Sequence, residues 1–355
     1  MDFQEHRELI KKLKRQITEP PSLDILQLLL SELQYTMQDN PDLGTDERKY
    51  VFSYSGFIKR WSLQRLQQTL DPQWDKLYWD TMLFEARNRV VDSYLIYLEK
   101  NRDPEDRFYE PRRKQFLKMG FTQALQDLID DEIDILSIST VPGSGKTTLG
   151  EMFMSGFMGW FPDLCNLFSS HSGHVTRMVY QVVCNIIGIG LKPGQMPEYT
   201  WREIFPNVEV ESNNANEQEI NLGKFKPFKT LTCRALGASQ TGVTRCEGIL
   251  YCDDLCSGIE MALSKIRLDK LWTMYSTDLK TRKKKGKRGR TCKELHIATR
   301  WSVWDVIGRI KTIYQSNKRC RFISVPDIDP ATGESNFDYD YGCLLYTSPS
   351  PRDTE

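Results

Sequence analysis

The chain has 355 residues, of which 39% are apolar and 11% aromatic, enough for a hydrophobic core and too many for a disordered or collagen-like protein. Lys plus Arg (48) equals Asp plus Glu (48), and this zero formal net charge excludes a uniformly basic protein that coats nucleic acid, although not a local basic patch. The length suggests two or three structural units, and no apolar run approaches the roughly 20 residues that a membrane span requires.

Residues 1–105 are predicted to form a helical accessory region, and its charged first 16 residues lack the apolar segment expected of a secretory signal. Leu23, Leu26, Leu30 and Leu33 recur at helical spacing, with Leu29 beside them. A second apolar set recurs over the next helical stretch: Trp61, Leu66, Leu70, Trp74, Leu77, Leu83 and Val90. Pro20-Pro21 and Pro41 are predicted to separate the helices. The region carries no catalytic signature, and its role is open.

Residues 106–326 are predicted to form an α/β domain. Apolar strand candidates occur at 133–139, 165–171, 231–238, 248–252, 294–299 and 320–326. Helices are expected between them, at 147–160, 174–188, 259–280 and 303–317. Strands that alternate with helices favour a mostly parallel sheet.

A glycine-rich segment follows the first strand candidate and precedes a helix. Glycines let the backbone curl so that several N–H groups face one anion, and the helix N-terminus adds partial positive charge. The segment predicts a P-loop in which Lys146 reaches the β- and γ-phosphates of a nucleotide and Thr147 ligates Mg²⁺. The usual pattern has Gly where this chain has Thr140, so the match is partial. The predicted nucleotide contacts are Pro142, Gly143, Ser144, Gly145, Lys146, Thr147 and Thr148.

The strand candidate 248–252 ends in two adjacent carboxylates. At a strand tip Asp253 is placed to hold Mg²⁺ through water, and Asp254 to orient and deprotonate the attacking water. Two adjacent acids favour hydrolysis over transfer to a small acceptor. The alternative interpretation is a turn that simply ends a strand. Cys252 and Cys256 are four residues apart, but no other Cys or His pair nearby has ligand spacing, so zinc is not expected.

The order of these motifs resembles the large subunit of the tailed-bacteriophage terminases, the ATP-driven motors that package viral DNA. The resemblance runs from about Tyr109 to Gly342. Residues 109–116 are similar to the family's adenine-recognition segment, and 241–245 to the segment that leads into the strand with the two acids. Ala298-Thr299-Arg300-Trp301, with Asp305 and Gly308-Arg309, is similar to its ATPase coupling motif. The family's second acid is often Glu, where this chain has Asp254.

The resemblance implies a P-loop NTPase fold with ATP as substrate and Mg²⁺ as cofactor. It implies nucleotide contacts for Gln115, Thr299 and Arg300, because a coupling element at a strand end can sense the γ-phosphate. It also implies that Arg245 is an arginine finger offered to the nucleotide of a neighbouring subunit. A surface salt bridge for Arg300 and an ordinary loop position for Arg245 are the alternatives.

The densest charge cluster lies at residues 280–290, where eight of eleven side chains are basic and none is acidic. Contact with the DNA backbone without reading of bases would suit such a run. The predicted DNA-binding residues are Lys283, Lys284, Lys285, Lys287 and Arg288. The alternative is a solvated hairpin loop. The four histidines form no catalytic or metal-binding pattern, and His171 and His174 are interpreted as structural or loop residues.

The family normally carries a second, RNase H-like nuclease domain. Residues 327–342 resemble the linker toward that domain, whereas 343–355 resemble translated adapter sequence and are expected to be disordered and dispensable. We do not assign Asp327, Asp329, Asp338 and Asp340 to a nuclease site, so endonuclease activity is expected only of a longer product.

The leading hypothesis is a motor subunit that hydrolyses ATP and moves double-stranded DNA into a procapsid. The resemblance implies a ring of identical subunits on the portal protein, a small terminase subunit as partner, no membrane, and the host cell cytoplasm as location. The nine scattered cysteines suit such a reducing compartment. Two alternatives remain open: a P-loop helicase or DNA-repair ATPase, and a non-catalytic DNA-binding remnant.

Overall fold

The computed structural model describes residues 1–192, 194–238, 244–285 and 291–337, which belong to two compact units. The first unit is Met1–Tyr97 and the second begins at Leu98, earlier than the predicted boundary at residue 105. The reason is Glu99, whose carboxylate accepts hydrogen bonds from the backbone N–H groups of Phe108 (2.9 Å) and Tyr109 (2.7 Å) and so ties this stretch to the second unit. Within the described ranges no helix is long and apolar enough to cross a membrane.

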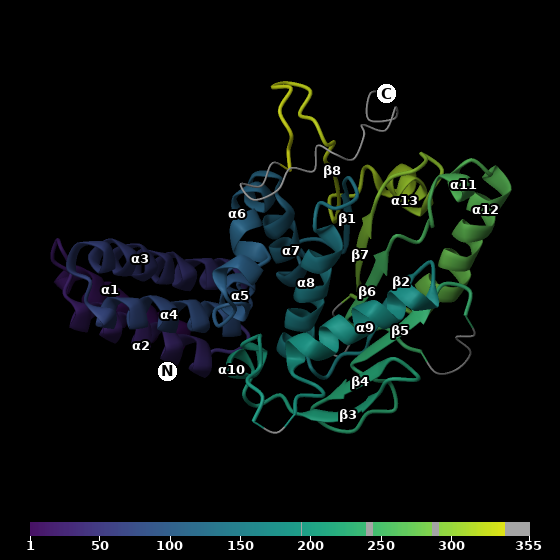
Figure 1. Cartoon of the computed structure of the whole chain (residues 1–355). Helices are drawn as coiled ribbons and strands as arrows, with labels where there is room; N and C mark the ends of the chain where they lie inside the picture. Colours follow the sequence, from purple (N-terminus) through teal and green to yellow (C-terminus); the bar gives the residue numbers. More distant parts are fainter. Residues whose placement is uncertain (193, 239–243, 286–290, 338–355) are drawn as a thin grey trace. The chain divides into compact units, whose positions relative to one another are not determined.

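The first unit is helical, as predicted (Figure 1). Its helices are α1 (Phe3–Gln16), α2 (Leu23–Asp39), α3 (Thr45–Thr69), α4 (Pro72–Arg87) and α5 (Val91–Leu98), the last of which ends at the unit boundary. Both predicted proline breaks fall between helices. Leu26, Leu29, Leu30 and Leu33 of α2 are buried in its core, as their spacing indicates.

Leu70 departs from the predicted apolar face. It ends α3 in the left-handed region (φ 56°) and is 82% exposed. Asp71 then caps α4 by accepting from the Gln73 N–H, and Pro72 takes the first helical position, where its missing N–H costs nothing. The sequence Leu-Asp-Pro therefore ends one helix and starts the next, a break that the apolar spacing alone does not reveal.

In its described residues, the second unit is an α/β domain built on one eight-stranded sheet in the order β3-β4-β5-β2-β6-β7-β1-β8. Its strands are β1 (Ile135–Ser139), β2 (Asn166–Ser170), β3 (Val210–Asn214), β4 (Glu219–Leu222), β5 (Leu231–Ala235), β6 (Ile249–Asp253), β7 (Lys293–Ala298) and β8 (Cys320–Ser324). The six predicted strands are confirmed, and all pairs among them are parallel. β3 and β4 add an antiparallel edge that the sequence did not predict, because four of the five residues of β3 are polar and exposed and β4 is only four residues long.

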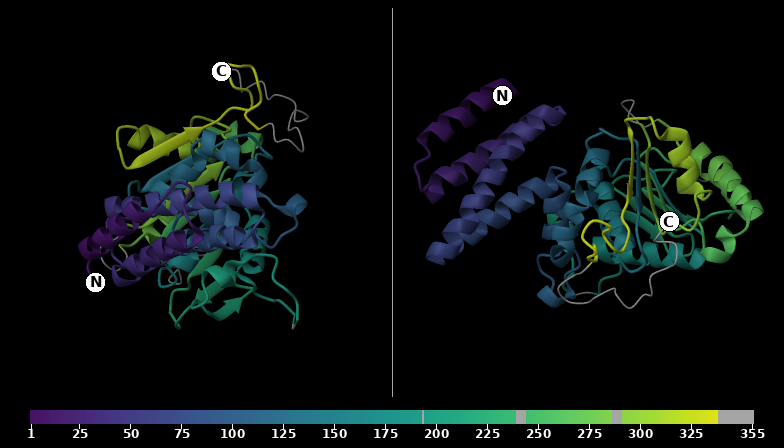
Figure 2. Two further views of the ribbon diagram at one scale, coloured as in Figure 1. Left: turned by 90° about the vertical axis from the view of Figure 1, so that its left-hand side faces the viewer. Right: turned by 90° about the horizontal axis from the view of Figure 1, so that it is seen from above.

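Helices cover both faces of this sheet (Figure 2). They are α6 (Tyr109–Lys118), α7 (Phe121–Ile129), α8 (Lys146–Trp160), α9 (Gly173–Ile187), α10 (Trp201–Ile204), α11 (Ile259–Ala262), α12 (Lys265–Met274) and α13 (Val306–Tyr314). α7, α8 and α9 pack on one face, and α12 and α13 on the other. The alternation along β6 shows why: Tyr251 faces α8, whereas Leu250 and Cys252 belong to the apolar cluster under α12 and α13. The predicted helix 259–280 is divided, because Ser264 caps a new helix and the last turn widens into a π-helix (Tyr275–Leu279).

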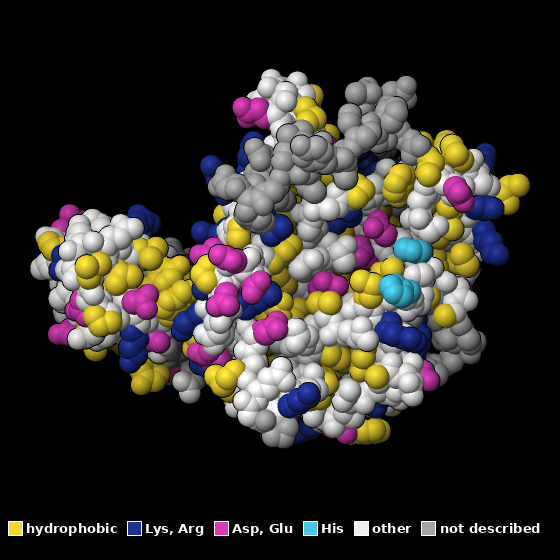
Figure 3. All heavy atoms as spheres, viewed as in Figure 1, with side chains coloured by type: hydrophobic (Ala, Val, Ile, Leu, Met, Phe, Trp, Pro, Cys, Tyr) yellow, Lys and Arg dark blue, Asp and Glu magenta, His cyan; other side chains and the backbone are white. Residues whose placement is uncertain are grey.

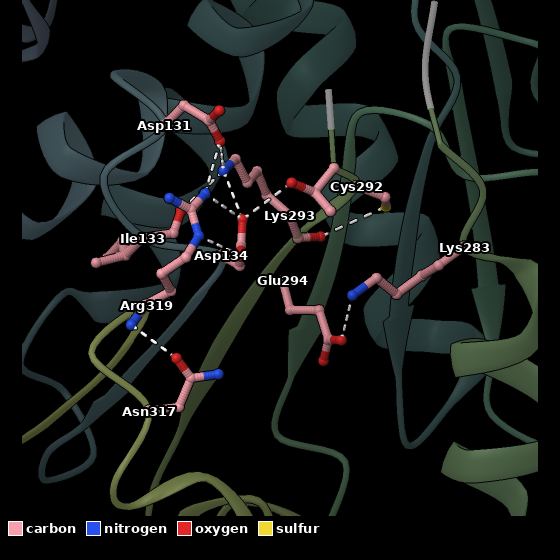
Figure 4. Close-up of polar contacts among 10 residues, drawn as sticks. Asp131, Ile133, Asp134, Lys283, Cys292, Lys293, Glu294, Asn317 and Arg319 are labelled. Atoms are coloured by element: carbon pink, nitrogen blue, oxygen red, sulfur yellow. Dashed lines mark hydrogen bonds and ion pairs between the residues drawn. The ribbon is translucent and has the colours of Figure 1, made fainter. Parts of the chain in front are cut away.

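Because the central strands are parallel, their carboxyl ends share one edge of the sheet and their amino ends the other. At the amino edge the ammonium of the buried Lys293 contacts Asp131 and Asp134 (2.8 Å) and the carbonyl oxygen of Ile133 (2.9 Å), as Figure 4 shows. Arg319 holds both oxygens of Asp134, at 2.6 and 2.8 Å, and this hydrogen bonding keeps the pKa of that carboxyl well below its usual range. The network ties the starts of β1, β7 and β8 together.

The predicted linker is partly folded in its described portion. Ile328 and Ser335 form an isolated antiparallel bridge, and Asp327 and Phe337 are buried. The remainder of the linker and the tail 343–355 lie outside the described residues.

Gly150 on α8 is required by the packing of the helix on β6. A Cβ there would come within 2.6 Å of Tyr251 Cζ and 2.8 Å of Ile297 Cδ1, both in the core. We expect Gly150→Ala to destabilise the protein by about 1–3 kcal/mol, the usual cost of overpacking. Gly56→Ala, in α3 with nothing within 4 Å of the added methyl, should instead stabilise by about 0.5–1 kcal/mol. Urea unfolding of both variants checks this; equal effects of the two substitutions would contradict it.

Candidate functional site

The loop between β1 and α8, residues 140–145, needs its glycines. Gly143 (φ 79°) and Gly145 (φ 83°) both adopt the left-handed region. At Gly145 an added Cβ would also lie 2.7 Å from the ring of Phe108. These positions admit no ordinary side chain, and the backbone of the loop stays open to a close approach by a ligand, with Pro142 and Gly143 exposed.

Lys146 begins α8 directly after the loop and is only 6% exposed. Its ammonium donates to the carbonyl oxygen of Val141 (3.2 Å) and to Thr299 Oγ1 (3.0 Å). Burial lowers the pKa of this ammonium, although the nearby Asp254 and Asp253 act in the opposite direction. A neutral hydroxyl and a carbonyl only partly satisfy a buried cation, so the position favours binding of an anion.

Asp253 ends β6 and is 2% exposed. Its Oδ1 is buried and has no hydrogen-bond partner among the described residues, and the nearby Thr147 hydroxyl favours the ionised form of the carboxyl. Burial, together with the charge of Asp254, raises the pKa of this carboxyl to about 7. A buried acceptor beside a threonine hydroxyl is a donor set that fits Mg²⁺, which takes oxygen ligands and one or two carboxylates.

Asp254 follows with φ 41°, a conformation that costs a non-glycine residue about 1–3 kcal/mol and persists only where the surroundings enforce it. Its N–H donates to the Ile297 carbonyl oxygen (2.9 Å), and its Oδ1 accepts from the Thr299 N–H (2.8 Å). Its carbonyl oxygen lies 2.9 Å from His171 Nδ1. Ile297 and Thr299 thus hold the N–H and the carboxylate of Asp254, and His171 contacts its carbonyl oxygen.

The structure brings the P-loop candidate, the two acids and the coupling segment together at the carboxyl edge of the sheet. Strand β7 lies between β1 and β6. Thr299, directly after β7, can therefore contact Lys146 through its side chain and Asp254 through its backbone. One residue links the predicted phosphate-binding cation to the predicted general base.

Arg300 is not part of this convergence. Its Nε donates to Asp305 Oδ2 (2.8 Å) and its Nη2 to the Ser302 carbonyl oxygen (3.0 Å). Asp305 also caps α13 by accepting from the Gly308 N–H (2.7 Å). The structure thus has the salt bridge that was the alternative interpretation for Arg300, and this bridge fixes the start of α13.

Arg245 and Lys283 lie at the amino edge of the sheet. Arg245 pairs with Glu247 (2.6 Å) and lies four residues before β6, whereas Asp253 ends that strand at the opposite edge of the sheet. The ammonium of Lys283 pairs with the fully buried Glu294, as Figure 4 shows. Lys284 and Lys285 are exposed. The predicted contacts Lys287 and Arg288 and the segment 241–243 lie outside the described residues.

Two residues of the predicted adenine segment belong to the core. Tyr109 and Phe116 are fully buried, and the Tyr109 hydroxyl bonds to Thr122 Oγ1 (2.9 Å), so both are core residues. Gln115, the predicted contact, is half-buried on α6. The residues that lie against the loop at Gly145 are Phe108 and Arg112, whose guanidinium stacks 4.6 Å from the Phe108 ring centre. Arg112 lies within the quoted motif, but nothing in the sequence shows which of its side chains faces the loop.

Glu151 on α8 is a further residue near the site that was not predicted. It is 6% exposed on α8, and burial, with a contribution from the charge of Asp253, raises its pKa to about 8. The sequence does contain a signal that could have singled it out. Glu151 is the only carboxylate in α8, and after Thr148 the other residues of this helix are apolar or small. At neutral pH this carboxyl is therefore mostly protonated in the metal-free protein, and a cation bound near Asp253 would favour its ionised form.

Glu151 should make the stability of the protein without nucleotide or metal depend on pH. Its pKa is about 8 in the folded protein against an ordinary 4.5, so folding takes up a proton and stability falls as pH rises from about 4.5 to 8. Glu151→Gln removes this titration, and we expect it to raise the thermal midpoint more at pH 8 than at pH 5. Glu260→Gln, at an exposed position on α11, serves as the control. A Glu151→Gln gain that is equal at both pH values would contradict the assignment.

Comparisons with known proteins assign no family, since a scan against protein-family models and a search of curated proteins both find no match. The chemistry therefore has to be judged from the site itself. The described residues hold no group of three or more His, Cys, Asp or Glu side chains suited to a metal. Mg²⁺ does not require one, because it keeps several waters and is commonly shared between one carboxylate and substrate phosphates. The site can thus bind a polyphosphate with its cation and hold a carboxylate beside it.

Proposed function

We propose that the second unit is a P-loop NTPase that hydrolyses ATP. The observation that carries the proposal is Thr299, which bonds to Lys146 through its side chain and to Asp254 through its backbone. If a phosphate displaced the Thr299 hydroxyl from the Lys146 ammonium, Thr299 would respond to the phosphate directly. The same residue holds the Asp254 carboxylate through its backbone N–H. Such a link between the binding cation and the base is what coupled hydrolysis requires.

In this proposal the glycine-rich loop binds the phosphates through its backbone N–H groups, and Lys146 neutralises their charge. Thr147 and Asp253 would hold Mg²⁺, which supplies charge neutralisation at the phosphate oxygens. Asp254 accepts a proton from the attacking water and orients it. Phe108 and Arg112, which lie against Gly145, border the nucleotide.

We further propose that the hydrolysis drives the packaging of double-stranded viral DNA. The ordered motifs that resemble the terminase large subunit support this, as does the basic segment at the amino edge. Within the described part of this segment Lys284 and Lys285 are exposed, and they suit contact with DNA phosphates without recognition of the bases. Arg245 also lies at that edge, so any contact with nucleotide would be with that of a neighbouring subunit, and the portal and small-subunit partners belong to the same proposal.

The proposal is tested by measuring phosphate release from ATP by the purified chain. We expect turnover that requires Mg²⁺ and increases with duplex DNA of any sequence. Absence of turnover despite ATP binding would favour a non-catalytic remnant, whereas unwinding of a tailed duplex would favour a helicase. Portal and capsid genes beside the reading frame would support the packaging role.

The DNA contact is tested by the salt dependence of binding. Lys284→Ala/Lys285→Ala should lower the slope of log K against log salt by about 0.9 for each lost phosphate contact, uniformly across sequences. Lys265→Ala/Lys270→Ala, at exposed positions on α12, is the control of equal charge. Lys283 is left out because it is paired with Glu294. A slope equal to that of the wild type would indicate a merely solvated segment.

A further inference from the structure

His171 follows directly after β2, the strand that neighbours β6 on the side away from β7. Its Nδ1 lies 2.9 Å from the carbonyl oxygen of Asp254. A carbonyl oxygen can only accept, so Nδ1 carries the proton and donates it. Sequence alone does not separate His171 from His174, and both are exposed; histidine side chains are cyan in Figure 3.

We propose that His171 is a positioning residue that holds Asp254 in its catalytic conformation, an inference that rests on the proposed ATPase function. The N–H and Oδ1 of Asp254 are held by Ile297 and Thr299, both from the β7 side. His171 supplies the hydrogen bond from the β2 side. Asp254 is therefore clamped between the two strands that flank its own, in a backbone conformation that it would otherwise leave.

The clamp has a consequence for catalysis. If the carbonyl is released, the peptide after Asp254 can rotate toward ordinary negative φ values, and the carboxylate moves with it. A displacement of about 1 Å at a catalytic group can lower the rate by up to about 100-fold. Binding of ATP depends on the loop and Lys146 and should not change. His171 thus acts on turnover through Asp254 rather than by touching the nucleotide.

The chemistry of the contact gives a set of matched variants. Asn carries an N–H at the δ position, where His171 Nδ1 stands, whereas Gln carries its N–H one atom further out, and Ala has none. We expect His171→Ala and His171→Gln to lower kcat about tenfold or more with an unchanged Kd for ATP. His171→Asn should restore most of the loss. His174→Ala, three residues on in the first turn of α9, is the control and should keep the wild-type kcat.

The measurement is phosphate release at saturating ATP, with ATP affinity and thermal midpoint recorded for each variant. A kcat that is the same in all four variants of an active enzyme would overturn the inference and leave the proposed function standing. An Asn variant no better than the Gln variant would overturn it too, because the δ donor would then be irrelevant. If the wild-type protein binds ATP but does not hydrolyse it, that result would contradict the proposed function and also the inference, which rests on it.

Discussion

Asp254→Asn is expected to lower ATP turnover by about 100-fold or more while ATP binding persists. The substitution removes the proton acceptor, and general-base catalysis typically contributes about 10²–10⁴-fold. Lys146, the loop and Asp253 are unchanged, so the nucleotide should still bind. Phosphate release at saturating ATP, together with a direct binding measurement, separates the two effects.

Asn is the right replacement because of the backbone at this position. Asp254 has φ 41°, a region that Asn tolerates better than most residues. The amide oxygen of Asn can also accept the Thr299 N–H that the carboxylate accepts now. The variant therefore loses charge without losing shape. Asp269→Asn, an exposed carboxylate paired with Arg309, is the control and should keep full turnover. Wild-type turnover in Asp254→Asn would remove Asp254 from the proposed mechanism.

The parts of the fold that could be predicted from the sequence are the strands whose residues are apolar and whose place in the sheet is buried. β1, β2 and β6 are buried along their whole length, so their apolar runs stood out from the helices between them. β3 could not be found in this way, because an edge strand with exposed polar residues resembles a loop in composition. The prediction of a continuous apolar face that includes Leu70 was wrong, because the spacing of apolar residues does not reveal a short junction between two helices.

The convergence of the loop, the two acids and Thr299 was predicted, whereas the residues around them were missed, for one physical reason. Lys146, Asp253 and Thr299 each follow or end a parallel strand, and the ends of parallel strands share an edge. His171 also follows such a strand, but its importance depends on β2 lying next to β6, and strand order cannot be derived from the chain order of the motifs. To predict Glu151 as part of the site, one would have to know that its face of α8 meets the end of β6.

Charged residues were the least secure part of the sequence analysis. A sequence shows that Lys283, Arg245 and Arg300 are cationic but not whether a carboxylate faces them. In the structure each has one, Glu294, Glu247 and Asp305 respectively. For Lys283 the partner is fully buried, which makes the pair part of the interior. Removing one member of a buried pair leaves the other charge uncompensated, so Lys283 is better understood as a stabilising residue than as a DNA contact.

Lys146→Met is expected to weaken ATP binding about 10- to 100-fold. A hydrogen bond to a charged group contributes about 1.5–3 kcal/mol, and each 1.4 kcal/mol is tenfold in affinity. Met keeps the length of the side chain while removing its charge. The ammonium of Lys146 already lies between the loop and β7, bonded to Val141 and Thr299, so little rearrangement is needed for it to meet a phosphate. Calorimetric titration with MgATP measures the change.

Lys226 offers a closely matched control for this experiment. It is half-buried where Lys146 is buried, but its pKa is also lowered by burial, and it too donates to a backbone carbonyl and a threonine hydroxyl, those of Pro162 and Thr230. Lys226→Met should therefore disturb the fold about as much as Lys146→Met does, while leaving ATP affinity unchanged. Equal losses of affinity in both variants would mean that the effect comes from general destabilisation. A loss confined to Lys146→Met would tie the glycine-rich loop to the phosphates, because the two lysines differ in where they lie rather than in how they are bonded.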